Sequence, residues 1–511
     1  MFENIAAFLS SKELPMRGLI ALAGVVAVYL IYLFLGVIYN IWLHPLSKFP
    51  GPRLRSGVHL INYLDEIYGT QVANTKSLHD RYGPVVRISP DSLSFNTAQA
   101  WKDIYQVKPG EAEIQKDMRF FTQNTNKIPS ILVSNTADHA RIRKLVINGF
   151  SDSALRSQEP VMIHYIRILM QQLKSHVNSS DDGKIDIMSW YIFTTFDTIG
   201  DLCFNETFQA LETGSYHPWM KTVLAGIKNG RWIRLQHAYP ALSWIMGLRK
   251  FVTSGQSHLN ADREKHLEYT HRKTKQRLAN TQPRDDIITP IMMKNGPKGM
   301  SDAELGQTLV LLTTAGSEPT AAGLSGATYH LLNNPDKLAR LTAEVRDSFA
   351  GPEEIDNLSS QKLPYLRAVI EESLRLYPPV PSRFPRRTEV EGVIIDGHVI
   401  PKNTSVGVAQ WATYQSTQNF AKPTEFIPER WLDDAPAPYK FDDKSSLQPF
   451  SMGPRNCIGK NFAYLQIRII ICHLLWHFDI KLAAESHNWA AQQAHLLWDM
   501  KPLNVHLSHR K

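Results

Sequence analysis

The chain has 511 residues, of which 43% are hydrophobic, so it can hold one large or two to three ordinary domains around a sizeable core. Its 56 Lys and Arg residues against 48 Asp and Glu give a net charge of +8 without a run of five like charges, and nothing indicates nucleic-acid binding. A solvated surface explains most of this excess, although a basic face for an acidic partner or anionic lipid also fits it. Three cysteines (Cys203, Cys457, Cys472) are too few for a disulfide framework or a zinc site and indicate a reducing compartment.

The N-terminal segment is apolar enough to cross a membrane. From Gly18 to Ser47 it has no charged residue, and about 20 residues suffice to span a bilayer. A cleaved signal peptide and a buried core helix are the alternatives, but the run exceeds the roughly 7–15 apolar residues of a signal peptide and no small-residue cleavage pattern comes after it. We therefore expect a single-pass anchor over residues 1–44.

Basic residues flank this span on both sides, with a narrow excess after it, which predicts a cytosolic body: Lys12 and Arg17 before it, and Lys48, Arg53 and Arg55 after it. Residues 45–53 contain three prolines and predict a stiff, non-helical hinge. The remaining residues, 54–511, form the expected catalytic domain. Residues 86–97 alternate around Pro90-Asp91 and predict a short hairpin, and most of the chain after residue 97 has a helical pattern.

The longest such pattern outside the anchor runs from Ser301 to Asn333, with Ser301 and Glu304 forming a capping box. Its middle reads Ala315-Gly316-Ser317-Glu318-Pro319-Thr320. Gly and Pro weaken a helix interior, by about 1 and 3 kcal/mol, so a plain kink is one interpretation. Because Pro319 lacks an N–H, we expect a local bulge with a free carbonyl.

Cys457 lies between a turn-forming segment and a helical pattern that begins at Lys460. A helix N-terminus favours a thiolate, and Arg455 adds a nearby cation. An ordinary buried cysteine is the alternative. The surrounding pattern Phe-x-x-Gly-x-Arg-x-Cys-x-Gly, made by Phe450, Gly453, Arg455, Cys457 and Gly459, resembles the haem-binding loop of the cytochrome P-450 family.

The resemblance implies a mainly α fold with small β-sheets, holding haem b between the helix of Gly316 and the loop of Cys457. Cys457 would be the axial thiolate of the haem iron. The Ala315–Thr320 segment resembles the family's oxygen-binding groove, in which Gly316 leaves room for O2 and Glu318 is the acid of a proton relay. Pro319 replaces the usual Thr, so we expect Thr320 to supply the hydroxyl, with Ser317 as the second candidate.

Further segments match the family in order. His139 and Arg143 stand four apart on a predicted helix, where a solvated basic patch is the alternative, and the resemblance implies that they bind one haem propionate while Arg386 binds the other. Glu372 and Arg375 match Glu-x-x-Arg, and Arg430 belongs to a Pro-Glu-Arg segment; by themselves Glu372 and Arg375 also fit a surface pair. The resemblance implies a buried structural triad.

The expected activity is a monooxygenase that inserts one atom of O2 into an apolar small molecule in fungal secondary metabolism. Electrons would come from NADPH through a flavoprotein cytochrome P-450 reductase, with cytochrome b5 as a further candidate partner, at the endoplasmic reticulum membrane. A redox-neutral haem-thiolate isomerase or dehydratase and a non-catalytic haem binder are the alternatives. Residues 107–131 and 208–248 are expected to shape the substrate pocket, but they name no substrate.

Overall fold

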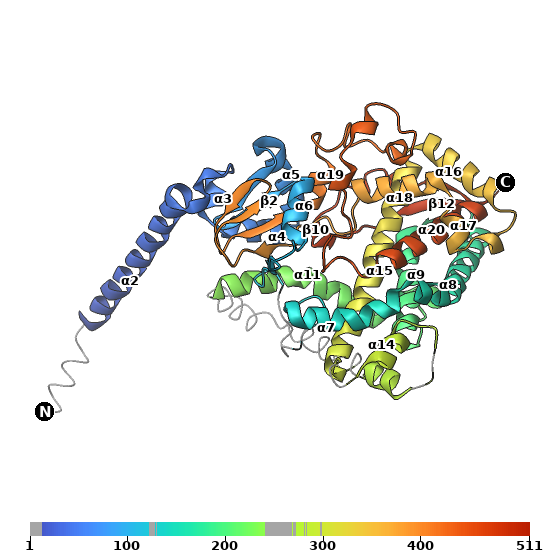
Figure 1. Ribbon diagram of the computed structural model, residues 1–511, viewed down its shortest axis with the longest axis horizontal. Helices are drawn as coiled ribbons and strands as arrows, with labels where there is room; N and C mark the ends of the chain where they lie inside the picture. Colours follow the sequence, from blue (N-terminus) through green and yellow to red (C-terminus); the bar gives the residue numbers. More distant parts are fainter. Residues whose placement is uncertain are drawn as a thin grey trace.

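The computed structural model describes residues 13–121, 128, 130–240, 268, 272–280, 282, 284–296 and 299–510. Most of this part is helical; strand β2 (Ser92–Phe95) lies on the side of the body nearest the N-terminal helix, whereas β12 (Asn504–His509) lies at the opposite end, near the C-terminus (Figure 1). The longer α-helices are α2 (Glu13–Ile38), α4 (Leu60–Tyr68), α5 (Gln71–Tyr82), α6 (Ala98–Tyr105), α7 (Thr136–Val146), α8 (Asp152–Ser179), α9 (Ile187–Phe204), α11 (Pro218–Ala238), α15 (Asp302–Leu332), α16 (Pro335–Ser348), α18 (Pro364–Leu376) and α20 (Lys460–His477). Shorter ones are α3 (Arg53–Gly57), α10 (Ala210–Thr213), α14 (Ile288–Lys294), α17 (Asn357–Ser360) and α19 (Gln410–Tyr414).

The largest sheet has the strand order β1-β2-β8-β5-β3, in which β2 and β8 are parallel and the other neighbours antiparallel. A second sheet has the order β4-β12-β9, and β6–β7 and β10–β11 are hairpins. The predicted hairpin of residues 86–97 is β1 and β2. The strands are β1 (Val85–Ser89), β2 (Ser92–Phe95), β3 (Gln115–Lys116), β4 (Lys184–Asp186), β5 (Arg386–Arg387), β6 (Val393–Ile395), β7 (His398–Ile400), β8 (Ser405–Val408), β9 (Phe478–Leu482), β10 (Ala494–His495), β11 (Leu497–Trp498) and β12 (Asn504–His509).

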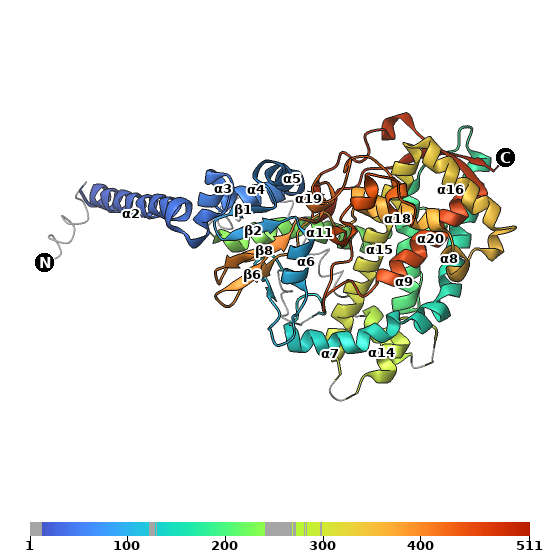
Figure 2. The same cartoon turned by 45° about the horizontal axis from the view of Figure 1, so that its top comes forward.

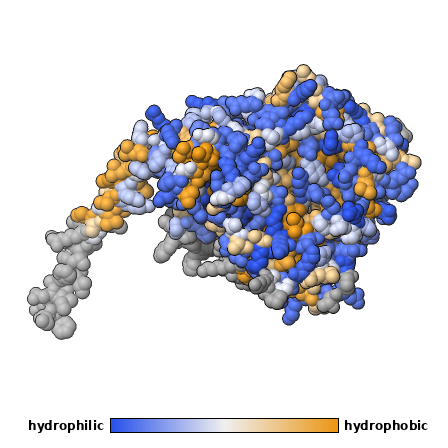
Figure 3. All heavy atoms as spheres, in the orientation of Figure 1, coloured by the Kyte–Doolittle hydropathy of each residue, from blue (hydrophilic) through white to orange (hydrophobic). Residues whose placement is uncertain are grey.

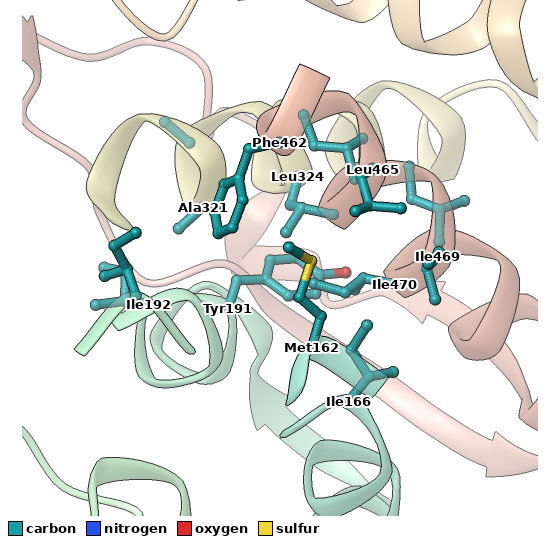
Figure 4. Packing of buried hydrophobic residues seen from close by; sticks show 14 of the residues in the cluster. Met162, Ile166, Tyr191, Ile192, Ala321, Leu324, Phe462, Leu465, Ile469 and Ile470 are labelled. Atoms are coloured by element: carbon teal, nitrogen blue, oxygen red, sulfur yellow. The ribbon is translucent and has the colours of Figure 1, made fainter. Parts of the chain in front are cut away.

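The main core lies where α8, α9, α15 and α20 meet (Figure 4). Met162 on α8, Tyr191 on α9, Leu324 on α15 and Phe462 on α20 are each at most 2% exposed and point toward one another. The only polar group that Figure 4 shows among them is the Tyr191 hydroxyl, and it lies 2.8 Å from the hydroxyl of Thr328. The two helices that carry the predicted functional segments, α15 and α20, are therefore fixed by the same core.

The N-terminal helix α2 extends away from the body in both views (Figures 1 and 2). The segment Ala23–Leu43 is long and apolar enough to cross a membrane, and none of it is buried in the protein. The predicted anchor begins earlier, at residue 1, but residues 1–12 lie outside the described part.

The hinge differs from its prediction in one respect. Pro45–Lys48 form a 3-10 helix, η2, so the link is partly helical, and the π-helix η1 (Tyr39–Leu43) lies just before it, within the predicted anchor. Proline is well accommodated at the first helical position, where its missing N–H has no helical partner in any case. The His44 side chain accepts a hydrogen bond from the Leu46 N–H (3.1 Å) and caps η2.

Candidate active site

Cys457 lies in the loop that leads into α20 and is held by backbone contacts. Its N–H donates to the carbonyl of Phe450 (2.9 Å), and the Asn456 N–H donates to that of Gly453 (3.1 Å). Gly453 has φ +75°, and a Cβ there would collide with the carbonyl oxygen of Tyr105. Glycine is therefore required at Gly453 on two grounds, its left-handed backbone and the close approach of another segment.

The Cys457 side chain is exposed, yet burial raises the pKa of its thiol. A backbone hydrogen bond at Gly459 and the charges of Arg143 and Lys460 act in the opposite direction. A residue that is accessible and still deeply surrounded by protein faces an internal space. Ala315, in the middle of the largely buried helix α15, is exposed as well.

Two arginines predicted to bind the cofactor, Arg386 and Arg455, lie around one carboxylate. Glu113 Oε1 accepts hydrogen bonds from Arg455 Nε (2.6 Å) and Arg386 Nη1 (2.7 Å), and all three side chains are at most 6% exposed. Burial raises the pKa of Glu113, but the two guanidinium groups outweigh this effect and lower it, so Glu113 stays charged.

Lys116 adds a further basic group to this cluster. Burial and the charges of Arg455 and Arg386 lower its pKa to about 7. His139 is buried, and burial together with Arg455, Lys116 and Arg143 lowers its pKa to about 4, so it is neutral at pH 7. The cations outnumber the single carboxylate, so the cluster has a net positive charge that a ligand with two carboxylates would neutralise.

Arg143 is placed differently from the other arginines. It donates from Nη1 to the carbonyl of Asn456 (2.8 Å) and from Nη2 to the Asn456 side chain. It therefore fixes the residue directly before Cys457, and its charge lowers the pKa of the thiol.

Helix α15 is continuous through Pro319, so the bulge predicted from the missing N–H does not interrupt it. The predicted capping box of Ser301 and Glu304 is present. A Cβ added at Gly316 would lie 3.0 Å from Ile199 Cγ1, so this glycine permits the close packing of α15 against α9. Helix packing thus gives one reason for glycine at Gly316, and its predicted role in leaving room for oxygen stays a prediction.

Glu318 has a buried carboxylate oxygen with unused acceptor capacity. This atom, Oε2, has no hydrogen-bond partner, and burial raises the pKa of the carboxyl to about 7, with the Lys228 charge lowering it and the Asp499 charge raising it. The two candidate hydroxyls are both bonded to helix carbonyls: Thr320 Oγ1 donates to Gly316 (3.2 Å) and Ser317 Oγ to Thr314 (3.2 Å). Glu318 is therefore the group of α15 that can change protonation near pH 7.

Glu372, Arg375 and Arg430 lie together with side chains that are 0% exposed. Arg375 donates to both carboxylate oxygens of Glu372 (2.8 Å each), and Arg430 Nε donates to Oε1 (3.1 Å). The N–H of Ile427 and the indole of Trp431 also donate to Glu372 (2.9 Å each). This cluster joins α18 to the 3-10 helix η6 (Pro428–Trp431), and the remaining guanidinium groups reach backbone carbonyls and Asp442.

Comparison with known proteins accounts for this arrangement. The family model described as Cytochrome P450 matches residues 52–507. A cytochrome P450 monooxygenase of Hormonema carpetanum, efuB, is 39% identical over 95% of this chain and 96% of its own. The trichothecene C-4 hydroxylase of Trichoderma arundinaceum is 39% identical over 96% and 98%, and the averantin hydroxylase of Dothistroma septosporum 38% over 96% and 91%.

The chain belongs to the cytochrome P450 family. Its fold agrees, since the crystal structure of the cytochrome P450DA heme domain superposes with a TM-score of 0.74 over 91% of this chain and 98% of that one, at 16% identity. The protein is a P450 monooxygenase, and its cofactor is haem b. The exposed Cys457 and the surplus of buried cations fit this cofactor, because haem requires an axial ligand and carries two carboxylates.

Two residues of this P450 site escaped the sequence reasoning. Glu113 and Lys116 lie in a segment that the sequence assigns to substrate binding, and their arginine partners are hundreds of residues away in the chain. The segment is marked only by a change from acidic to basic residues between Glu111 and Lys116, and such a pattern is common on protein surfaces. Of the other residues expected to shape the pocket, 122–127, 129 and 241–248 lie outside the described part.

Proposed function

We propose that this P450 oxidises an apolar small molecule of fungal secondary metabolism, by hydroxylation, epoxidation or a related reaction. Two of its relatives are named as hydroxylases of averantin and of trichothecenes, so the same reaction type is the best starting hypothesis. The observation that carries the proposal is the exposed Cys457 beside a cluster of cations, at the point where α20 begins.

In this proposal Cys457 holds the haem iron, while Phe450, Gly453 and Gly459 shape the loop around the sulfur. Bound haem supplies the activation of O2. The carboxylates of haem are held by the basic cluster, for which we propose Arg455, Arg386, Arg143, His139 and Lys116. Glu372, Arg375 and Arg430 act at a distance, by fixing the segments on which the loop rests.

Glu318 is the proposed proton carrier. A carboxyl group with a pKa of about 7 exchanges protons readily at neutral pH, and its Oε2 is free to accept one. Thr320 is the proposed hydroxyl, because it lies buried on the same helix and Pro319 stands where the family has Thr. Ala315 is exposed at the same level of α15 and would face the bound cofactor.

We further propose that α2 anchors the protein in the endoplasmic reticulum membrane, with the body in the cytosol. Its electrons would then come from NADPH through a membrane-bound reductase, with cytochrome b5 as a second donor. The apolar segment Ala23–Leu43 supports the anchor, and Lys48, Arg53 and Arg55 after it favour a cytosolic body.

The decisive experiment is the carbon-monoxide difference spectrum of the reduced protein. The native protein is expected to give the long-wavelength Soret band of a thiolate ligand, and Cys457→Ser is expected to lose it. Cys472→Ser is the matched control, because Cys472 lies on α20, is fully buried and should leave the band unchanged. Well-folded native protein without that band would overturn the proposal.

A redox-neutral isomerase or dehydratase stays the second candidate, because Pro319 removes the usual hydroxyl of the relay. The two functions differ in their use of electrons. Consumption of NADPH in step with product favours the monooxygenase, and conversion of substrate without NADPH or reductase would favour the alternative. Feeding candidate terpenoids, polyketides and alkaloids to a host that contains the reductase would identify the substrate.

A further inference from the structure

Helix α11 carries three basic residues at intervals of three, Lys228, Arg231 and Arg234, which lie on successive turns along one side of the helix. The first and the last are paired with carboxylates from other segments. Lys228 pairs with Asp499, and Arg234 pairs with Glu66 of α4 (2.8 Å). The middle residue, Arg231, has no ion pair within the part of the chain that the structure describes.

The guanidinium group of Arg231 is short of hydrogen-bond acceptors. Its Nε and Nη1 are buried, and neither has a partner among the described residues. The face of the body in Figure 3 is mostly hydrophilic, so a basic side chain is ordinarily solvated there, but these two nitrogens are not. Arginine is always charged, and a buried charge without a partner is strongly unfavourable. The site of Arg231 therefore suits an anion.

Arg231 lies between α11 and the β10–β11 hairpin. Burial lowers the pKa of His495 on β10, a hydrogen bond with the carbonyl of Glu66 raises it, and the nearby charge of Arg231 lowers it. Helix α11 contacts both α4 and β10, and Figure 1 shows it passing below them. Arg231 thus belongs to a cluster built by three separate elements.

The same cluster reaches Glu318, the proposed proton carrier on α15. The charges of Lys228 and Asp499 both act on the pKa of Glu318. Lys228 lies three residues before Arg231, and at 1.5 Å rise per residue this separation is about 4.5 Å along the helix. Arg231 is therefore about one helical turn away from the residue of α11 whose charge acts on Glu318.

Two segments that the sequence assigns to the substrate pocket meet beside Arg231. Helix α11 comes from residues 208–248, and Phe120 comes from residues 107–131. The guanidinium carbon of Arg234 lies 4.8 Å from the centroid of the Phe120 ring. The row of basic residues on α11 thus adjoins both segments.

The carboxylates of this cluster are already engaged. Glu66 accepts hydrogen bonds at both oxygens, from Arg234 Nε (2.8 Å) and from Gln71 Nε2 (3.3 Å). Asp499 Oδ1 accepts from Lys228. Neither carboxylate has an ion pair with Arg231, so a bound molecule has to supply the anion that this guanidinium group lacks.

We infer that Arg231 determines substrate specificity by binding a carboxylate of the substrate, which is therefore an otherwise apolar carboxylic acid. The inference rests on the proposed function and narrows its substrate class. Guanidinium and carboxylate groups match in geometry and form charge-assisted hydrogen bonds, among the stronger ones in proteins. With its acid group held at α11, such a substrate is oxidised at a carbon distant from that group.

Spectral titration of the full-length holoenzyme tests the inference. The probes are ω-(imidazol-1-yl)alkanoic acids of increasing chain length, each compared with the 1-alkylimidazole of equal length. The imidazole nitrogen binds the haem iron and shifts the Soret band, so the dissociation constant is read from the absorbance. At the optimal chain length the acid is expected to bind about 10–100-fold more tightly than the alkylimidazole, as hydrogen bonds to charged groups predict.

Three variants assign this preference to a residue. Arg231→Met is expected to bind the acid no more tightly than the alkylimidazole. Arg231→Lys should keep only part of the preference, because lysine retains the charge without the planar fork of donors. Arg367→Met on α18 is the matched control, because its side chain is 59% exposed, and it should keep the full preference.

Urea unfolding of the holoenzyme without probe separates a binding role from a structural one. Arg231→Met removes a buried charge that has no partner, so it should be at least as stable as the native protein. Arg234→Met breaks the buried pair with Glu66 and should be less stable than the native protein. A loss of stability in Arg231→Met equal to that in Arg234→Met would overturn the inference.

The titration can overturn the inference in three ways. Equal affinity of the native protein for acid and alkylimidazole at every chain length would do so, as would a failure of every acid to bind where imidazole itself binds. A preference that survives in Arg231→Met would show that another cation holds the carboxylate. A Soret band that imidazole itself does not shift would instead overturn the proposed haem site, and the inference with it.

Discussion

Replacement of Glu372 by alanine is expected to be the most damaging single change away from the cofactor. Glu372 accepts five hydrogen bonds, three from guanidinium nitrogens of Arg375 and Arg430 and two from Ile427 and Trp431. Alanine leaves two fully buried guanidinium groups without their shared counter-ion. Breaking a buried ion pair in this way costs about 3–5 kcal/mol, a large part of the roughly 5–15 kcal/mol that stabilises a folded protein.

The chain provides a control for this change. Glu425 pairs with Lys422 at 3.2 Å, but both side chains are more than half exposed. Such pairs contribute no more than about 1 kcal/mol. Arg375 bonds the backbone carbonyl of Glu425, which an alanine side chain does not remove. Glu425→Ala therefore changes an ion pair and leaves the buried cluster intact.

The assay is urea unfolding with haem content measured in parallel. Glu372→Ala is expected to lower the free energy of unfolding by about 3–5 kcal/mol and to lose haem, and Glu425→Ala by less than about 1 kcal/mol. If Glu372→Ala is not produced in folded form, Glu372→Gln replaces it, because glutamine keeps the side-chain volume and removes only the charge. Its free energy of unfolding should lie between the values for Glu425→Ala and those expected for Glu372→Ala. Equal stability and full haem in Glu372→Ala would refute the reasoning.

The cluster also predicts a dependence on pH. Burial would raise the pKa of Glu372, but Arg375 and Arg430 outweigh burial and lower it. An acid whose folded pKa lies below its unfolded value of about 4.3 contributes its full stability above that pH, and the contribution is lost as the pH falls through the folded pKa. Urea unfolding between pH 7 and pH 3 should therefore show a steeper loss of stability in the native protein than in Glu372→Gln below about pH 4. Parallel curves would contradict the lowered pKa.

Three further predictions concern the active site. In Glu318→Gln the amount of product formed per NADPH should no longer change with pH near pH 7. The variant should also be roughly 3 kcal/mol more stable than the native protein at pH 9, because a carboxyl with a folded pKa of about 7 is costly to ionise. Unchanged stability at pH 9 would contradict the burial argument. Gly453→Ala should abolish haem binding, because its Cβ collides with Tyr105. Gly110 has φ +82° with open space around it, so Gly110→Ala should lower the free energy of unfolding by only about 1–2 kcal/mol through backbone strain and should keep its haem. The haem content of the two variants therefore separates the collision from backbone strain. Gly316→Ala should lower stability by about 1–3 kcal/mol through overpacking against α9 in urea unfolding, and no change would show that the helices adjust freely.

The sequence predicted best those parts of the site that are local in the chain. The loop around Cys457 and the pair Glu372 and Arg375 are short patterns whose spacing determines their geometry. Arg430 was assigned only because its own segment matched the family. The fold class followed from the same resemblance together with the long helical patterns, and the P450 fold bears it out.

Features that depend on distant partners were not predicted. Glu113 lies between arginines 273 and 342 residues away, and no local pattern encodes that meeting. The N-cap of α7 is Asn135, and its neighbours Thr136 and Asp138 are also good capping residues, so that only the path of the chain decides among the three. The close contact of Gly316 with Ile199 of α9 was likewise not predicted, because it joins helices more than 100 residues apart in the chain.

The side of α4 that faces the core could not be predicted from the sequence either. Its sequence, LINYLDEIY, has a clear apolar stripe, but periodicity does not say which side of a helix faces the core. The default assignment would bury the leucines. Arg55 and Arg234, from two other helices, reverse that assignment by pairing with the acidic residues.

Two glutamates on neighbouring helices show how the fold separates structure from chemistry. Helix α15 packs against α18, and both helices carry a carboxyl group removed from solvent. Glu372 on α18 has five donors, so its pKa is lowered and it stays charged. Glu318 on α15 has an oxygen without a donor, so burial dominates and its pKa rises to about 7. Burial acts on both, and the number of donors decides the sign of the shift, which is why only Glu318 of this pair can carry a proton at neutral pH.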